Sequence, residues 1–229
     1  GNLGIGSIIL NTSAATTLTA TSKLAGSFVK TGDETLNLTS AAFSNSSGST
    51  LTVEKGTVVL GEGATYSGTL NIHLKGEGTR LSVTGSATNI SGTGTLTMGD
   101  QTRLSLVNGN GSSRSNNLSI VLDAGTGGTV RIDGLTYGTI NYDKTITGTG
   151  NLHIVNDQGN NTFRQRGGWI TNSYVGDTSF YSENDKVSLV EYNVNNVVLT
   201  EGQTLTPWGT GNVYIGGTDS TYNAKNCAV

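Results

Sequence analysis

One nine-residue phrase occurs twice in the chain, and this repetition restricts the fold more than any other feature. Residues 90–98 read ISGTGTLTM and residues 146–154 read ITGTGNLHI. Both copies alternate apolar and polar residues after a Gly-Thr-Gly turn, a pattern typical of one β-strand and one corner. A unit of this size cannot bury its own apolar face, so neighbouring units of the same kind must complete it.

Looser versions of the phrase lie before and between the two copies, at residues 56–60, 68–72, 78–83 and 128–132. A series of near-equivalent strands predicts an all-β solenoid, a parallel β-helix wound without crossover helices. With two or three strands in each coil, we expect a coil to take roughly 20 to 28 residues and successive coils to lie about 4.8 Å apart.

The composition agrees with this fold. Thr (36), Gly (34), Ser (23) and Asn (23) together make 116 of the 229 residues. Thr favours strands through its branched Cβ, whereas Gly and Asn favour corners with positive φ. Hydrophobic residues make only 34 % of the chain, which is enough for a narrow stack of strands. The alternative, a disordered chain, is less favoured because the apolar residues alternate at period two.

The alternation also predicts which side chains face the interior. We expect Asn71, His73, Arg80 and Ser82 to point outward. The inward set is predicted to be Leu70, Ile72, Leu74, Leu81, Val83, Leu96, Met98, Leu152 and Ile154.

Three regions are predicted along the chain. Residues 1–24 hold two entry or cap strands, at Ser7–Leu10 and Thr17–Ala20, and residues 25–155 hold the β-helix repeats. Residues 156–229 are richer in aromatic side chains, which indicates either a C-terminal β-rich cap or an aromatic surface that stacks on sugars. Within the repeats, Asn108–Asn117 has no apolar side chain and is predicted to be a projecting loop.

Charge and targeting signals exclude several classes of protein. The net charge is −3 without an evident basic patch, so nucleic acid is not an expected partner. No apolar run approaches the roughly 20 residues of a membrane span. The chain does not open with a charged and then an apolar segment, so we expect that any export signal has been removed. The lone Cys227 excludes an internal disulfide, though pairing with another chain stays open.

Two stretches near the N-terminus resemble the autotransporter-associated β-strand repeat. Residues 28–38 read FVKTGDETLNL and are followed by TLTVEKGTV at residues 50–58. Residues 65–70 (TYSGTL) are similar to the middle turn of that repeat, and Lys75–Thr79 to another opening. The resemblance covers residues 25–155 and implies a right-handed parallel β-helix from an exported bacterial passenger protein. It further implies an adhesin, an aggregation factor or a surface stalk. The translocator of that family is missing from this sequence, which would make the chain a fragment or a processed piece.

Some β-helices cleave polysaccharides with clustered carboxylates and an Arg or Lys on one face. The nearest candidates are Asp123, Arg131, Asp133 and Asp143, which could share a face over one or two coils. Isolated surface charges explain these four residues equally well. We therefore expect no catalytic residues.

Other chemistry is also not expected. His73 and His153 occupy outward strand positions without a Cys, His or Asp cluster, so a solvated face is favoured over a metal site. Gly176–Ser179 (GDTS) fits no serine nucleophile motif. Asp177, Asp185 and Asp219 each stand alone, unlike the acidic residues of calcium loops. No phosphate-binding loop occurs. The sequence therefore predicts neither a metal nor a cofactor.

Thr-x-Thr pairs raise the possibility of ice binding. They occur at residues 17/19, 50/52, 95/97, 145/147 and 204/206. The separations between successive pairs are all different and share no coil length, and this irregularity argues against a lattice match.

The sequence thus favours a non-catalytic surface or secreted passenger that acts through outward polar ladders. Its expected partners are host or bacterial surface molecules, including glycans or other copies of the chain. In the full-length protein it would be anchored in the outer membrane. The alternative is a β-helix that binds or cleaves carbohydrate.

Overall fold

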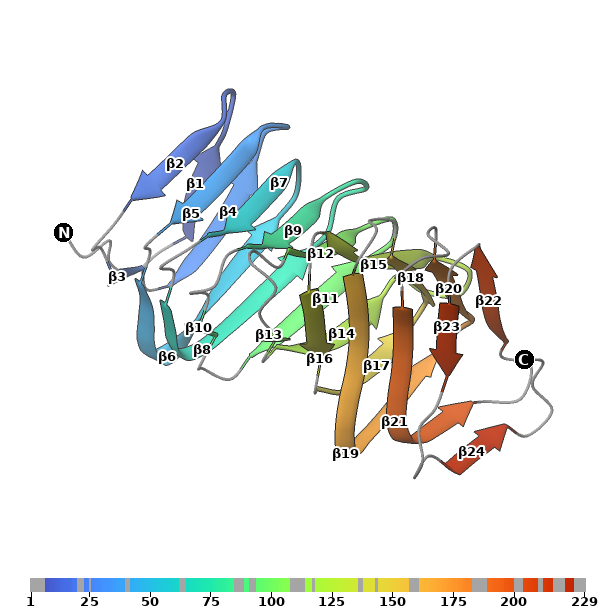
Figure 1. Cartoon of the computed structure of the whole chain (residues 1–229). Helices are drawn as coiled ribbons and strands as arrows, with labels where there is room; N and C mark the ends of the chain where they lie inside the picture. Colours follow the sequence, from blue (N-terminus) through green and yellow to red (C-terminus); the bar gives the residue numbers. More distant parts are fainter. Residues whose placement is uncertain are drawn as a thin grey trace.

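The computed structural model shows an all-β solenoid whose described residues form 24 strands in two sheets (Figure 1). Every strand pairing in the described part of the chain is parallel. None of the described segments forms a helix long and apolar enough to cross a lipid bilayer. The structure describes residues 7–19, 23–24, 26–39, 42–61, 65–84, 89–90, 94–107, 114–116, 118–135, 138–142, 144–156, 161–182, 189–199, 204–209, 212–215 and 221–224.

One sheet has nine strands, and each strand pairs with strands one coil before and one coil after it. Its strands, in spatial order, are β2 (Thr16–Thr19), β5 (Thr35–Thr39), β7 (Thr57–Leu60), β9 (Arg80–Val83), β12 (Arg103–Val107), β15 (Thr129–Leu135), β18 (Asn151–Asn156), β20 (Thr178–Ser182) and β22 (Leu205–Gly209).

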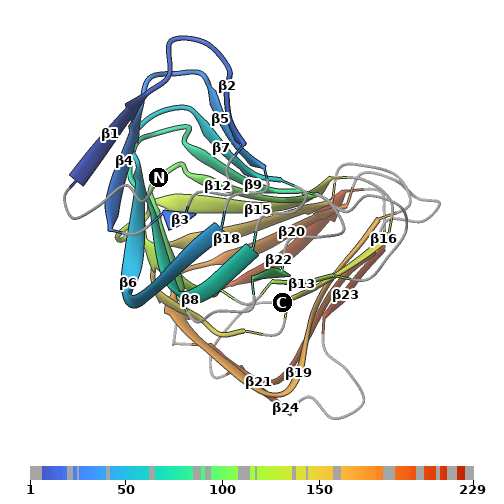
Figure 2. The same cartoon turned by 90° about the vertical axis from the view of Figure 1, so that its left-hand side faces the viewer.

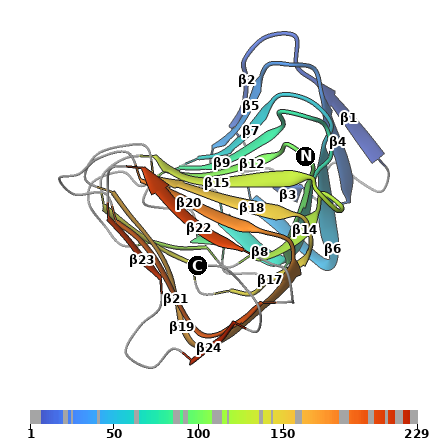
Figure 3. The same ribbon diagram turned by 90° about the vertical axis from the view of Figure 1, so that its right-hand side faces the viewer.

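The other sheet has fifteen strands and bends around a corner of the solenoid. Figures 2 and 3 show the bend within the long strands β19 and β21, so the coils enclose a roughly triangular interior. Its strands in chain order are β1 (Ser7–Asn11), β3 (Lys23–Leu24), β4 (Ser27–Thr31), β6 (Ala42–Val53), β8 (Thr65–Leu74), β10 (Asn89–Ile90), β11 (Thr95–Gly99), β13 (Arg114–Asn116), β14 (Ser119–Asp123), β16 (Gly138–Tyr142), β17 (Ile146–Thr149), β19 (Asn161–Val175), β21 (Leu189–Leu199), β23 (Asn212–Ile215) and β24 (Thr221–Ala224).

The predicted coil length is confirmed. In the nine-stranded sheet, the shortest step between paired residues is from Thr16 to Leu36 and the longest is from Arg103 to Arg131. Both steps lie within the predicted range, and the other pairs in this sheet fall between them.

The longest coil contains the stretch that was predicted to be a projecting loop. That prediction is wrong for Arg114–Asn116, which form β13 and pair with β16. The remainder, residues 108–113 and Asn117, lies outside the described residues.

The predicted interior is confirmed with one exception. Eight of the nine residues are buried at 3 % exposure or less: Leu70, Ile72, Leu74, Leu81, Leu96, Met98, Leu152 and Ile154. Val83 is only partly buried, although it packs against the core. On the same strand, Ser82 lies on the outer face as predicted, yet it is buried at 6 % exposure. Outward position therefore does not mean solvent exposure on this sheet.

Lys30 is an inward residue that no apolar pattern predicted. It lies between Leu10 and Val53 in a column of the fifteen-stranded sheet and is fully buried. Its ammonium donates hydrogen bonds to the carbonyls of Gly32, in its own turn, and Lys55, in the next coil, at 2.7 Å for Lys55. Burial lowers the pKa of Lys30, and the carboxylates of Asp33 and Glu34 oppose that shift. The side chain thus joins the corners of two successive coils.

The strands after residue 156 extend the same solenoid. β18 pairs with β20 and β20 with β22, while β17 pairs with β19 and β19 with β21. Strand pairing therefore does not change at the predicted boundary of residue 156. Among the aromatic residues of this region whose side chains are described, Tyr174 and Phe180 are buried and Tyr181 is partly exposed.

Candidate functional site

Three arginines form a column on the outer face of the nine-stranded sheet. Arg80 of β9 pairs with Arg103 of β12, and Arg103 pairs with Arg131 of β15. His153 of β18 and Ser179 of β20 continue the column. Adjacent positions in such a ladder are about 4.8 Å apart. The solenoid therefore aligns cationic side chains that are separated by a full coil of the chain.

A second column runs beside the arginines, two residues further along each strand. It contains Ser82, Ser105, Asp133 and Val155. All four side chains are buried, at 6 %, 0 %, 0 % and 2 % exposure. Val155 is buried but is not part of the main hydrophobic core, because it lies on the outer face of the sheet. We call the positions of these two columns on β9, β12, β15 and β18 the arginine ladder, comprising Arg80, Ser82, Arg103, Ser105, Arg131, Asp133, His153 and Val155.

Hydrogen bonds connect the two columns across coils. The Nε of Arg80 donates to the Oγ of Ser105, one coil further on, at 2.8 Å. The Nε of Arg103 donates in the same diagonal direction to the Oδ2 of Asp133. The diagonal neighbour of Arg131 is Val155, whose side chain accepts no hydrogen bond. The Nε of Arg131 donates instead to the Oδ2 of Asp133, on the same strand, at 3.1 Å. One carboxylate oxygen therefore accepts from two guanidinium groups.

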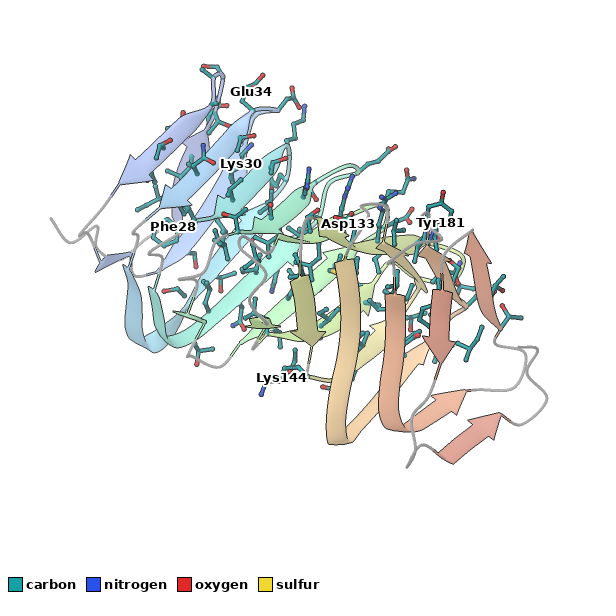
Figure 4. All side chains as sticks on the ribbon, viewed as in Figure 1. Phe28, Lys30, Glu34, Asp133, Lys144 and Tyr181 are labelled. Atoms are coloured by element: carbon teal, nitrogen blue, oxygen red, sulfur yellow. The ribbon has the colours of Figure 1, made fainter. Side chains whose placement is uncertain are left out.

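The charges of the arginine ladder do not balance among its own residues. Asp133 is the one carboxylate among these residues and pairs with Arg103 and Arg131, while the Nε of Arg80 donates to the hydroxyl of Ser105. The Arg103 and Arg131 side chains are 31 % and 34 % exposed, whereas the Asp133 side chain is fully buried. Figure 4 places Asp133 on the nine-stranded sheet near the middle of the solenoid. The cationic groups therefore reach solvent, and the anionic group does not.

His153 does not add charge to this column at neutral pH. Burial and the neighbouring guanidinium of Arg131 both lower the pKa of the His153 imidazole below its usual 6.5. The imidazole is therefore mainly uncharged at pH 7.

The structure brings together only two of the four residues predicted as a catalytic cluster. Arg131 and Asp133 are ion-paired, but Asp123 is an exposed residue at the end of β14, in the other sheet. Asp143 lies outside the described residues. Asp133 is poorly placed to act as an acid or base on a substrate, because it has no solvent contact and two guanidinium groups hold one of its oxygens.

The expectation that no basic patch exists is wrong, because Arg80, Arg103 and Arg131 align in one column. A signal was present in the sequence: residues 80–82 read RLS, residues 103–105 read RLS and residues 131–133 read RID. Each copy places an arginine and a short polar residue on the same face of a strand. The separations of these copies equal one coil, so they become neighbours only after the chain is wound.

The structure does not bring the other described candidates together in one site. His73 and His153 lie on different sheets, and both are partly exposed on outer faces. Asp177 lies at a corner where its Oδ1 accepts a hydrogen bond from Thr204 N at 2.8 Å, and its own N donates to Asn151 Oδ1 at 2.9 Å. Asp185, Asp219 and Cys227 lie outside the described residues. In the described part, no group of three or more His, Cys, Asp or Glu side chains could hold a metal ion.

The Thr-x-Thr pairs are more regular in space than along the chain. Thr52, Thr97 and Thr147 occupy one outward column of the fifteen-stranded sheet, with His73 and Val121 between them. Each step from one of these threonines to the next therefore corresponds to two coils. Three of the five pairs stack on alternate coils of one face, and the argument from unequal separations does not hold for them.

No protein-family model matches the chain, and comparisons with curated proteins and with solved structures gave no significant match.

Proposed function

We propose that this chain is a non-catalytic binding segment of an exported surface protein, of the kind that the autotransporter-type repeat implies. It would be displayed outside the cell, anchored in the outer membrane as part of a longer protein. Its partners would be molecules of a host or bacterial surface, including glycans or further copies of the chain.

One observation carries this proposal: apart from Lys30, the described inward columns are stacked apolar side chains, and ladders of polar residues face outward. Inward columns such as Leu51, Ile72, Leu96 and Ile120 are fully buried. Their outward neighbours are largely threonine, serine and asparagine, and they are only partly exposed. A ligand must therefore meet the sides of the solenoid, where many weak hydrogen bonds add together.

The proposal is tested by binding of the purified chain to glycan arrays and to bacterial cells, with product analysis in parallel. We expect saturable binding, no cleavage of any glycan, and a stepwise loss of binding as outward residues of successive coils are replaced by lysine. Turnover of a polysaccharide would contradict the proposal and would favour the alternative of a carbohydrate-cleaving β-helix.

Ice binding is a second candidate, because Thr50/Thr52, Thr95/Thr97 and Thr145/Thr147 stack on alternate coils of one face. Hydroxyl and methyl groups would repeat about 6.6 Å apart along each strand and about 9.6 Å apart between the paired coils. A match to the ice lattice requires regular spacing of this kind. Asn71 and His73 occupy the equivalent positions on the coil between the first two pairs.

Changing that intervening coil gives a direct test of the second candidate. The double substitution Asn71→Thr/His73→Thr completes three consecutive Thr-x-Thr coils and is expected to increase inhibition of ice recrystallisation. Thr97→Lys, at the centre of the face, is expected to remove it. Wild-type chain that leaves ice growth unchanged would eliminate this candidate without affecting the first.

A further inference from the structure

The arginine ladder has more positive charge than its own carboxylate balances. Arg80, Arg103 and Arg131 lie in adjacent positions of one column, and Asp133 is the one carboxylate among the residues of the ladder. Like charges stacked at this spacing repel one another. Negative charge on a bound partner would reduce this repulsion.

The guanidinium group of Arg103 is also oriented for a partner. Each arginine donates from Nε to a buried residue of the ladder, either Ser105 or Asp133. In the part of the chain that the structure describes, the two Nη atoms of Arg103 have no hydrogen-bond partner, and its side chain is 31 % exposed. A guanidinium held at Nε presents its Nη donors in a fixed fork, which suits the paired oxygens of a carboxylate or a sulfate.

The spacing of the column favours a polymer over a single anion. The three arginines repeat once per coil, about 4.8 Å apart. This distance is close to the length of one sugar residue in an extended polysaccharide. A chain of acidic sugars lying along the solenoid axis could therefore place one anionic group near each guanidinium.

We propose that Arg80, Arg103 and Arg131 form a binding site for the carboxylate or sulfate groups of an acidic polysaccharide. This inference rests on the proposed function, because it names the partner class of one of the outward ladders. Ser105 and Asp133 are positioning residues in it, since they hold the guanidinium groups from the buried side. Nucleic acid is less favoured because the chain has a net charge of −3.

The test measures binding of the purified chain to polygalacturonate, dextran sulfate, neutral dextran and duplex DNA at several salt concentrations. Polygalacturonate and dextran sulfate separate the carboxylate source from the sulfate source. We expect binding to at least one of them that weakens with salt, and none to neutral dextran. Arg103→Gln is expected to lower the affinity about tenfold, and Arg80→Gln/Arg103→Gln/Arg131→Gln to abolish binding.

Two further variants keep the test decisive. Arg103→Lys retains the charge but loses the fork, and its affinity is expected to lie between those of wild type and Arg103→Gln. Lys144→Gln makes the same change in net charge on the opposite side of the solenoid, as Figure 4 shows, and is expected to bind like wild type. Circular dichroism confirms that each variant is folded. If the triple variant fails to fold, the comparison of Arg103→Gln with Lys144→Gln decides.

Several results would overturn the inference. They are the absence of binding to either acidic polysaccharide, equal losses in Arg103→Gln and Lys144→Gln, or stronger binding to DNA than to both polymers. Binding to an acidic polysaccharide that survives in the folded Arg103→Gln and triple variants would disprove this site while leaving the proposed function in place. Cleavage of either polymer would contradict the proposed function itself.

Discussion

The two copies of the repeated phrase occupy different sheets. In the first copy, Thr95–Gly99 form β11 of the fifteen-stranded sheet. In the second copy, the aligned residues Asn151–Ile154 lie in β18 of the nine-stranded sheet, and Ile146–Thr149 form β17 of the fifteen-stranded sheet. Leu96 pairs with Ile120 on the next coil, and Ile120 pairs with Ile146 on the coil after that. Leu152 therefore does not lie in the same column as Leu96.

This difference shows that the phrase encodes a corner followed by a strand but does not determine which corner of the coil, and so which sheet, the strand belongs to. The two copies join different sheets, but their aligned apolar residues point inward in both, as the alternation predicted. Leu96, Met98, Leu152 and Ile154 are all buried at 1 % exposure or less. Alternation at period two determines which residues point inward on any strand, whichever sheet the strand joins.

The largest expected effect tests whether the two copies are equally buried. Leu96→Asp and Leu152→Asp are each expected to lower the free energy of unfolding by about 3 to 5 kcal/mol, because an unpaired carboxylate would enter the apolar interior. Thr97→Asp, at a partly exposed outward position beside Leu96, is expected to cost less than about 1 kcal/mol. Urea denaturation measures all three variants. If Leu152→Asp lowered the free energy of unfolding much less than Leu96→Asp, Leu152 would be less deeply buried than Leu96.

The aligned glycines of the two copies provide the next test. A Cβ at Gly94 would lie 1.9 Å from the carbonyl oxygen of Leu70, whereas a Cβ at Gly150 would lie 2.8 Å from the Ala124 side chain. Gly94→Ala must therefore displace backbone of the preceding coil and is expected to cost about 3 kcal/mol. Gly150→Ala has a φ of 147° and meets only a side chain, so about 1 to 3 kcal/mol is expected.

A second substitution separates the two causes at Gly150. Adding Ala124→Gly to Gly150→Ala removes the steric contact but leaves the strained φ, so part of the lost stability is expected to return. No recovery in thermal unfolding experiments would assign the whole cost to the backbone conformation. Loss of more stability in Gly150→Ala than in Gly94→Ala would reverse the proposed order.

The sequence was sufficient for the fold class, the coil length and the inward residues, since these depend on local alternation and average spacing. It was not sufficient for relations between coils, because coil lengths differ, as the short step from Thr16 to Leu36 and the long step from Arg103 to Arg131 show. Small variations of this kind hid the alignment of the three arginines and that of the Thr-x-Thr pairs. For the same reason the repeated phrase does not mark a step of two whole coils, because two coils beyond Leu96 the chain has reached Ile146.

The burial of Lys30 and Asp133 was not predicted, for another reason. Both are fully buried polar residues, and a pattern of hydrophobicity assigns such residues to the surface. Lys30 occupies an inward position because two carbonyl groups at adjacent corners accept its hydrogen bonds. Asp133 is buried with its Oδ2 accepting from guanidinium groups of two coils. Partners that come from different coils leave no local signal.

The smallest expected effect concerns Thr97 and His153, which are aligned outward residues of the two copies. Burial and Arg131 lower the pKa of His153 in the folded state, so between that value and 6.5 the unfolded state binds more protons than the folded state. This group therefore contributes a loss of stability as the pH falls below about 6.5. His153→Thr gives the second copy the residue of the first, and it is expected to reduce the decline in unfolding free energy between pH 8 and pH 5. Carboxylates titrate in both proteins, so the difference between the two pH profiles isolates the imidazole. Identical profiles would show that His153 titrates alike in the folded and unfolded chain, and would remove the electrostatic distinction between the two copies.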